Sequence, residues 1–283
     1  AVASGQAAEA LAIQNLAEAG SHIVASAALY GGTYNLLHYT LPKFGIDATF
    51  VEDPDNLDEW RSAIRPNTKA FYGETIGNPR NDVLDIEGIS KVAHEAGIPL
   101  IVDNTVASPW LIRPFEWGAD IVVHSATKYL GGHSDVVGGA VVAKSAEDLQ
   151  QLAWWANCLG ITGSAFDSFL TLRGMRTLHA RMDIHERNSR ELAQWLAAQP
   201  GVARVFYPGL ATHPGHALAA RQQRGFGAIV SLELEGGTPA VRKFVAALEL
   251  FSLAESLGGV ESLVAHPATM THAAMDPAAR AAA

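Results

Sequence analysis

The sequence predicts an α/β protein in two parts. A large domain with a mostly parallel sheet is expected over residues 1–186, and a smaller α+β domain over residues 187–283. The first half alternates short apolar runs with amphipathic stretches, which is typical of a parallel sheet covered by helices on both faces. The second half has long helical stretches, then two strand candidates and one more helix. We place the boundary near residue 186, within the long helical region.

The expected elements follow in chain order. The apolar runs predict strands at residues 22–26, 48–52, 70–74, 99–103, 121–124 and 140–143. Helical spacing predicts helices at residues 5–19, 57–64, 86–96, 149–157, 165–178, 184–198 and 239–248. The helix at 184–198 should stop before Pro200-Gly201, a stop signal. Strands are expected at residues 203–207 and 228–233.

Composition excludes several classes of protein. With 283 residues, 48% hydrophobic and 17% charged, the chain can bury enough surface to exclude dominant disorder. No apolar run reaches the ~18 residues of a membrane-spanning helix. The net charge of −9 argues against nucleic acid and anionic membranes as partners. The lone Cys158 excludes an internal disulfide framework.

The ends of the sequence carry further expectations. Residues 1–5 lack the basic start and apolar core of a signal peptide, and with the single cysteine this favours the cytoplasm. Residues 278–283 read as an alanine-rich helical stretch without a stop signal. Both ends look cut rather than finished.

The polar residues after the strands are the candidates for chemistry, because ligands of open α/β sheets bind beyond the carboxyl ends of the strands. After the strand at 121–124 come Ser125, Thr127 and Lys128. A lysine can form a Schiff base with an aldehyde, and hydroxyl groups suit phosphate oxygens. An ordinary surface turn explains this cluster equally well.

Asp103 ends the apolar strand before it. A carboxylate there needs a partner, because an isolated buried charge is costly. The nitrogen of a pyridinium ring is one such partner, and backbone amides at a turn are the other.

Three more clusters are weak by themselves. Gly5 and Gln6 open a helix whose first amides can bind an anion, although Ser4 can equally be an ordinary N-cap. Tyr30 precedes two glycines that are expected to form a tight turn, which would place its ring over a flat ligand or in the core. Asn78 precedes a proline, and can face a ligand or cap a turn. Eleven histidines show no metal-binding spacing, so we expect no metal site.

Together these motifs resemble the Cys/Met-metabolism family of pyridoxal-phosphate enzymes, which have the aspartate-aminotransferase fold (fold type I). The resemblance covers the whole chain, and its most specific motifs are SATKYLGGH (125–133), VDNT (102–105), YGGTY (30–34), ETIGNP (74–79) and AESLGGVESL (254–263). It implies the cofactor pyridoxal 5′-phosphate (PLP), small amino-acid substrates and a homo-oligomer, a dimer of dimers.

The resemblance also implies roles for single residues. Lys128 would form the Schiff base with the cofactor and then move protons. Tyr30 would stack on the cofactor ring and assist proton transfer, and Asp103 would pair with the ring nitrogen. The cofactor phosphate would be held by four residues, which are Gly5, Gln6, Ser125 and Thr127. The substrate side would be formed by Asn78, Glu255 and Ser256.

The two halves resemble different branches of this family. Residues 3–132 resemble O-acetylhomoserine sulfhydrylases, and the sequence from His133 onward resembles cystathionine γ-synthases. The implied reaction is γ-replacement on an O-acylhomoserine by cysteine or sulfide, which gives cystathionine or homocysteine. The alternatives are elimination of the cystathionine γ-lyase type and a non-catalytic, truncated or chimeric member. The family's segment before the Ser-Gly motif and its later carboxylate-binding arginine have no match here, so we expect an incomplete cofactor site.

Overall fold

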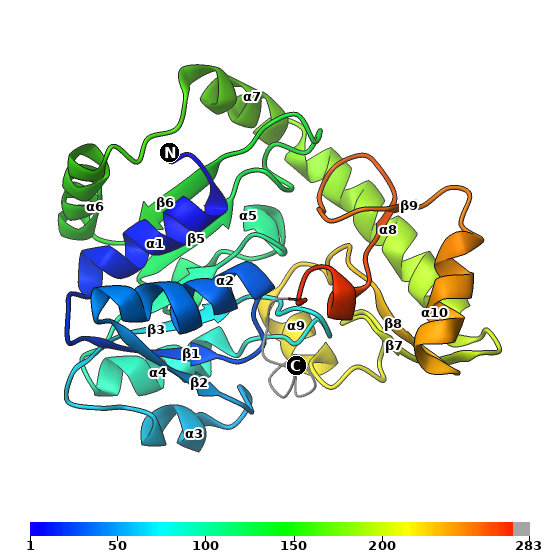
Figure 1. The fold of residues 1–283 in the computed structure, drawn as a ribbon, viewed down its shortest axis with the longest axis horizontal. Coiled ribbons are helices and arrows are strands. Elements are labelled where there is room, and N and C mark those ends of the chain that lie inside the picture. The colour runs from blue at the N-terminus through cyan, green and yellow to red at the C-terminus, as the bar shows by residue number, and fades with distance from the viewer. Residues whose placement is uncertain (274–283) are drawn as a thin grey trace.

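A six-stranded sheet forms the centre of the first half of the molecule (Figure 1). The structure is a computed structural model and describes residues 1–273. The strand order is β2-β1-β3-β4-β5-β6. All neighbouring pairs are parallel except β5 with β6, which is antiparallel. The strands are β1 (His22–Ser26), β2 (Asp47–Val51), β3 (Thr68–Glu74), β4 (Leu100–Asp103), β5 (Ile121–Ser125) and β6 (Gly139–Ala143). The prediction of a mostly parallel sheet is confirmed.

Helices cover both faces of this sheet, and each face has its own apolar core. Alternate residues of β1 separate the two cores: Ile23 packs with residues of α1 (Gly5–Leu16), whereas Val24 packs with residues of α4 (Ile86–Glu95). The other helices of the first half are α2 (Gly31–Asn35), η1 (Leu36–Thr40), η2 (Leu41–Phe44), α3 (Leu57–Ser62), α5 (Ser108–Leu111), η3 (Pro114–Trp117) and α6 (Ala146–Leu159). Because helices cover both faces of the sheet, the strands appear in the sequence as continuous apolar runs.

The second half begins with two helices and continues into small sheets. Figure 1 shows α8 running from the top of the view toward β7, β8 and α10, which lie on the side away from α3 and α6. β7 and β8 pair antiparallel, and β9 and β10 pair parallel. The elements are α7 (Ala165–Met175), α8 (Leu178–Ala197), β7 (Val202–Phe206), α9 (His216–Gln222), β8 (Ser231–Leu234), α10 (Gly237–Ala246), β9 (Ser252–Leu253), β10 (Leu263–Val264) and η4 (Pro267–Thr269).

Several predicted boundaries differ from the structure. The helix predicted at 165–178 is two helices, because the backbone amide and the hydroxyl of Thr177 both donate to the Gly174 carbonyl and Thr177 leaves the helical conformation. The first helix ends at Leu16 and not near residue 19, since Ala17 is extended. The strand predicted at 228–233 begins only at Ser231, and α9 was not predicted.

Other differences concern the glycines at 31 and 32 and the domain boundary. The expectation of a tight turn after Tyr30 is wrong, because both glycines lie in the first turn of α2. The boundary near residue 186 falls inside α8, a continuous 20-residue helix, and stays a prediction. The helical stretch expected at 278–283 lies outside the described residues. Within residues 1–273, no helix has the length and apolarity needed to cross a bilayer.

Candidate active site

The carboxyl ends of three adjacent strands bring the predicted site residues together. Glu74 at the end of β3 pairs in register with Asp103 at the end of β4, and Asp103 pairs with Val123 of β5, two residues before Ser125. The start of α1 lies against the same edge of the sheet. Gly5 is so close to Ser125 that a β-carbon added to Gly5 would lie 2.6 Å from Ser125 Cβ. The parallel sheet therefore gathers residues that are far apart in the sequence.

Lys128 lies in a tight loop just after β5. The Lys128 amide donates to the Ser125 carbonyl at 3.2 Å, and the Gly132 amide donates to the Lys128 carbonyl at 2.8 Å. The Nζ of Lys128 donates to the Ser256 hydroxyl at 3.2 Å. Burial lowers the pKa of Lys128, and the charge of Glu255 partly opposes this shift. Lys128 is therefore more readily neutral, and more nucleophilic, than an exposed lysine.

Asp103 is held by the turn that follows β4. Its Oδ1 accepts a 2.7 Å hydrogen bond from the Thr105 amide, and the Thr105 hydroxyl in turn accepts from the Ser125 amide at 2.7 Å. Burial raises the pKa of Asp103 to about 6, although the hydrogen bonds from Thr105 oppose this. No lysine, arginine or histidine in residues 1–273 forms an ion pair with Asp103. This partly buried carboxyl group suits a ligand nitrogen that carries a proton.

The start of α1 and the loop after β5 supply donors for an anion. Ser4 caps α1 by accepting from the Ala7 amide at 3.1 Å, and the first amides of any α-helix have no acceptor within the helix. Gly5 is required here, since a larger residue would collide with Ser125. The Thr127 hydroxyl is engaged with the backbone of Gly138, to whose carbonyl it donates at 3.3 Å.

Tyr30 lies at the start of α2, with 44% of its surface exposed. Its amide donates to Glu74 Oε1 at 2.6 Å. Burial raises the pKa of its hydroxyl, and the charges of Glu255, Glu9 and Glu74 raise it further. The charge of Glu255 therefore affects the pKa of both Tyr30 and Lys128.

Asn78 lies beyond the end of β3, in a loop that contacts the second half of the chain. The side-chain amide of Asn81 donates to the carbonyls of Phe206 and Ile229, at 2.9 and 3.1 Å. The Ser231 hydroxyl donates to the Pro79 carbonyl at 2.6 Å. Residues on both sides of the predicted domain boundary thus fix the loop that carries Asn78.

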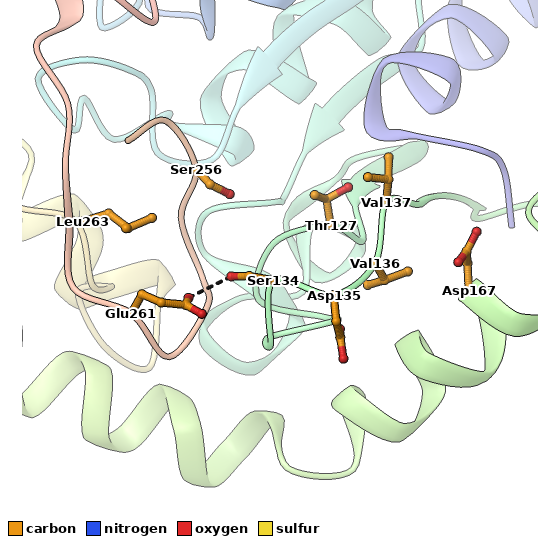
Figure 2. Close-up of a pocket in the computed structure, with 9 residues that line it drawn as sticks. All are labelled: Thr127, Ser134, Asp135, Val136, Val137, Asp167, Ser256, Glu261 and Leu263. Atoms are coloured by element: carbon orange, nitrogen blue, oxygen red, sulfur yellow. Dashed lines mark hydrogen bonds between the residues drawn. The ribbon is translucent and has the colours of Figure 1, made fainter. Parts of the chain in front are cut away.

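Two of the predicted site residues, Thr127 and Ser256, line a cavity of about 650 Å³. Figure 2 shows the side chains that line it. The carboxylates of Asp135, Asp167 and Glu261 also line this cavity. Glu261 accepts a hydrogen bond from the Ser134 hydroxyl at 2.8 Å. The remaining predicted site residues do not line this cavity. Among residues 1–273, no group of three or more His, Cys, Asp or Glu side chains is placed to hold a metal ion.

Sequence reasoning gave no role to three residues that the structure places at the site. Thr105 joins the turn after β4 to the start of the loop after β5. Glu74 and Glu9 are buried, and both reach the start of α2. Their signal in the sequence is weak: Glu74 ends an otherwise apolar strand, and Glu9 interrupts an apolar stretch of α1.

These groups fit PLP by the chemistry of their donors and acceptors. The helix start and the hydroxyl groups suit a phosphate, Asp103 suits a protonated ring nitrogen, and Lys128 suits an aldehyde. The comparison with family models agrees, since the model of the Cys/Met metabolism PLP-dependent enzymes matches residues 1–283. The chain belongs to this family of PLP-dependent enzymes. PLP is therefore its cofactor, and the expected fold type is confirmed.

Members of the PLP-dependent family with different reactions resemble this chain to a similar degree. Cystathionine gamma-synthase of Escherichia coli (strain K12) is 48% identical over 264 residues, which are 93% of this chain and 68% of the relative. O-acetyl-L-homoserine sulfhydrylase of Leptospira meyeri is 43% identical over 315 residues, which cover 96% of this chain and 71% of the relative.

A solved structure adds a third activity within the family. Cystathionine gamma-lyase from Lactobacillus plantarum, complexed with L-serine, superposes with a TM-score of 0.95 at 41% identity, and the match covers 99% of this chain and 73% of that one. These likenesses establish a transsulfuration-type PLP enzyme and leave the individual reaction open.

Proposed function

We propose that this protein catalyses γ-replacement on an O-acylhomoserine, with cysteine or sulfide as the nucleophile and cystathionine or homocysteine as the product. The supporting observation is the contact between Lys128 Nζ and the Ser256 hydroxyl, with Glu255 close enough to act on both Lys128 and Tyr30. The likeness to a cystathionine gamma-synthase and to a sulfhydrylase is consistent with both nucleophiles.

Different residues of the chain hold different parts of the cofactor. Gly5, Gln6, Ser125 and Thr127 bind the phosphate, Asp103 keeps a proton on the ring nitrogen, and Tyr30 stacks on the ring. When bound, PLP supplies an electron sink for the electron pair released at the substrate α-carbon. Asn78, Glu255 and Ser256 form the substrate side of the site.

Lys128 moves the protons. Its neutral Nζ accepts the α-proton of the substrate, and the Ser256 hydroxyl at 3.2 Å orients Nζ during this step. Further proton transfer by Lys128, assisted by the Tyr30 hydroxyl, allows the γ-acyloxy group to leave and the thiol to add. The lowered pKa of Lys128 favours this role, because a base must be neutral before it can accept a proton.

The test begins with visible absorption of the purified protein mixed with PLP, beside a Lys128→Ala variant. We expect the band of lysine-bound cofactor only when Lys128 is present. A single O-acylhomoserine is then offered with cysteine, with sulfide and with no added nucleophile. Formation of cystathionine or homocysteine supports γ-replacement. A keto acid and ammonia as the main products with every nucleophile would instead establish elimination of the γ-lyase type, which the resemblance to a cystathionine gamma-lyase makes the second candidate.

We also propose that the protein is a cytoplasmic homo-oligomer, a dimer of dimers, acting on small amino-acid substrates. One face of α7 is exposed and apolar, with Phe166, Phe169 and Leu172 exposed by 67%, 59% and 55%. Large exposed apolar patches of this kind are typical of protein interfaces.

If neither the cofactor band nor turnover is found, the chain is a non-catalytic, truncated or chimeric family member.

A further inference from the structure

The first turn of α2 is held by side chains from other elements. Tyr30 is the N-cap residue of α2 and makes no side-chain capping hydrogen bond. It is followed by Gly31 and Gly32, and glycine leaves the backbone more freedom than any other residue. The sequence alone therefore leaves the Tyr30 ring poorly fixed.

Glu74 holds the backbone of Tyr30 from the end of β3. Its Oε1 accepts the Tyr30 amide at 2.6 Å, a short bond of the kind that carboxylate acceptors form. Only 6% of the Glu74 surface is exposed. The carboxyl group of Glu74 therefore connects the central sheet directly to the residue expected to cover the cofactor.

Glu9 holds the same turn from α1. Its Oε1 accepts the Thr33 hydroxyl at 3.1 Å, and its Oε2 accepts the Gln6 side-chain amide at 3.3 Å. The same Gln6 amide also donates to the Gly32 carbonyl at 3.3 Å. The helix that carries the predicted phosphate-binding residues is thus tied to the turn that carries Tyr30.

Both carboxyl groups are costly to bury. Glu9 is 4% exposed, and neither Glu9 nor Glu74 forms an ion pair with a lysine, arginine or histidine within residues 1–273. Burial and the nearby Asp103 raise the pKa of both. Two apolar side chains would fill this space at a lower cost. Their hydrogen bonds to the Tyr30 amide, the Thr33 hydroxyl and the Gln6 side chain indicate that they serve the site.

We propose that Glu74 and Glu9 are positioning residues that fix the Tyr30 ring relative to the cofactor. The inference rests on the proposed stacking role of Tyr30 and extends it to two residues that touch neither cofactor nor substrate. Glu74 sets the backbone position of Tyr30. Glu9 holds Thr33 one turn later and links this turn to Gln6.

The first experiment needs no cofactor. We compare Glu74→Met, which keeps the volume and loses the acceptor, with Glu74→Gln, which keeps an acceptor oxygen. Amide hydrogen exchange at Tyr30 is expected to be about tenfold faster in Glu74→Met and close to wild type in Glu74→Gln. The exposed Glu18→Met variant is the matched control and should leave the Tyr30 rate unchanged. An unchanged rate at Tyr30 in Glu74→Met would overturn the inference.

The second experiment uses the protein with PLP added. Visible circular dichroism of the cofactor band reports the asymmetry imposed by a stacked ring. We expect this signal to fall at least twofold per bound cofactor in Glu74→Met and in Glu9→Leu, and to be retained in Glu74→Gln. An equal signal in Glu74→Met and wild type would contradict the proposed role of Glu74 in positioning the Tyr30 ring over the cofactor. If wild-type protein binds no PLP, the proposed function fails, whereas the exchange experiment still decides whether Glu74 holds Tyr30.

Discussion

At the scale of single residues, burial changes the acid–base behaviour of the groups at the site. Lys128 and Asp103 are shifted in opposite directions, because the pKa of the lysine falls and that of the carboxyl group rises. Both shifts favour the neutral form, as expected when charge is removed from water. The Lys128 amine is therefore more readily neutral, and the Asp103 carboxyl group a weaker acid, than the same groups in water.

Replacement of Glu255 should make Lys128 a faster nucleophile toward the cofactor aldehyde. The charge of Glu255 raises the pKa of Lys128, so Glu255→Gln should lower it further and increase the neutral fraction. We expect the rate of cofactor-band formation at pH 7.5 to rise, because only the neutral amine attacks the aldehyde. The measurement is stopped-flow absorbance over a pH series, with Glu235→Gln as a control. A rate equal to or below wild type contradicts this account.

Asp103 predicts a pH dependence of stability in the absence of PLP. Its pKa is about 6 in the folded chain against an ordinary value of 3.8, so the folded state binds the proton more tightly. The free energy of unfolding should therefore fall as pH rises through this window. In Asp103→Asn the fall should be smaller, as measured by urea unfolding at pH 4, 5 and 7. The exposed Asp135→Asn variant should behave like wild type, and an unaltered pH dependence in Asp103→Asn would refute the assignment.

At the scale of elements, the loop after β3 connects the two parts of the chain. Asn81 is 2% exposed and has a left-handed backbone (φ 60°). It donates to the carbonyls of Phe206, the last residue of β7, and of Ile229, just before β8. The chain between β3 and α4 therefore places Asn78 and also holds the second half of the molecule.

Asn81→Ala should destabilise the fold by about 3 kcal/mol, because two buried carbonyls lose their donor and alanine is strained at positive φ. Asn81→Gly loses the same hydrogen bonds without the backbone strain, so its loss should be about 1 kcal/mol smaller. Urea unfolding of both variants beside wild type measures these differences. Equal stability of all three proteins would show that the loop contributes nothing to the connection.

Periodicity predicted most elements of the first half, because buried parallel strands give clear apolar runs, as in β1 and β5. It missed the break between α7 and α8, since that break depends on a hydrogen bond of Thr177 that leaves the apolar pattern unchanged. At the site, Lys128 and Asp103 could be predicted from the sequence, because each lies at or just after the carboxyl end of a predicted strand and these strand ends lie together. The roles of Glu9 and Thr105 depend on contacts across 24 and 20 residues, which no local pattern contains.

At the scale of the whole molecule, the exposed apolar face of α7 predicts association between copies. Phe169→Glu should shift the protein toward a smaller species, because a charge at a buried contact is costly. Analytical ultracentrifugation at several concentrations measures this. Glu147→Lys, on the exposed start of α6, is a control for charge change. A wild-type protein that stays monomeric at all concentrations would remove the proposed oligomer.

The hydrogen bond between Lys128 and Ser256 joins positions separated by 128 residues. A growing chain therefore carries Lys128 through the synthesis of almost half of the protein before its hydroxyl partner exists. The sheet can form early, whereas the surroundings that tune the amine arrive last. In refolding, far-ultraviolet circular dichroism should accordingly recover before the protein gains the ability to capture PLP, and simultaneous recovery would contradict this order. Cofactor loading thus becomes a late step that reports a finished fold.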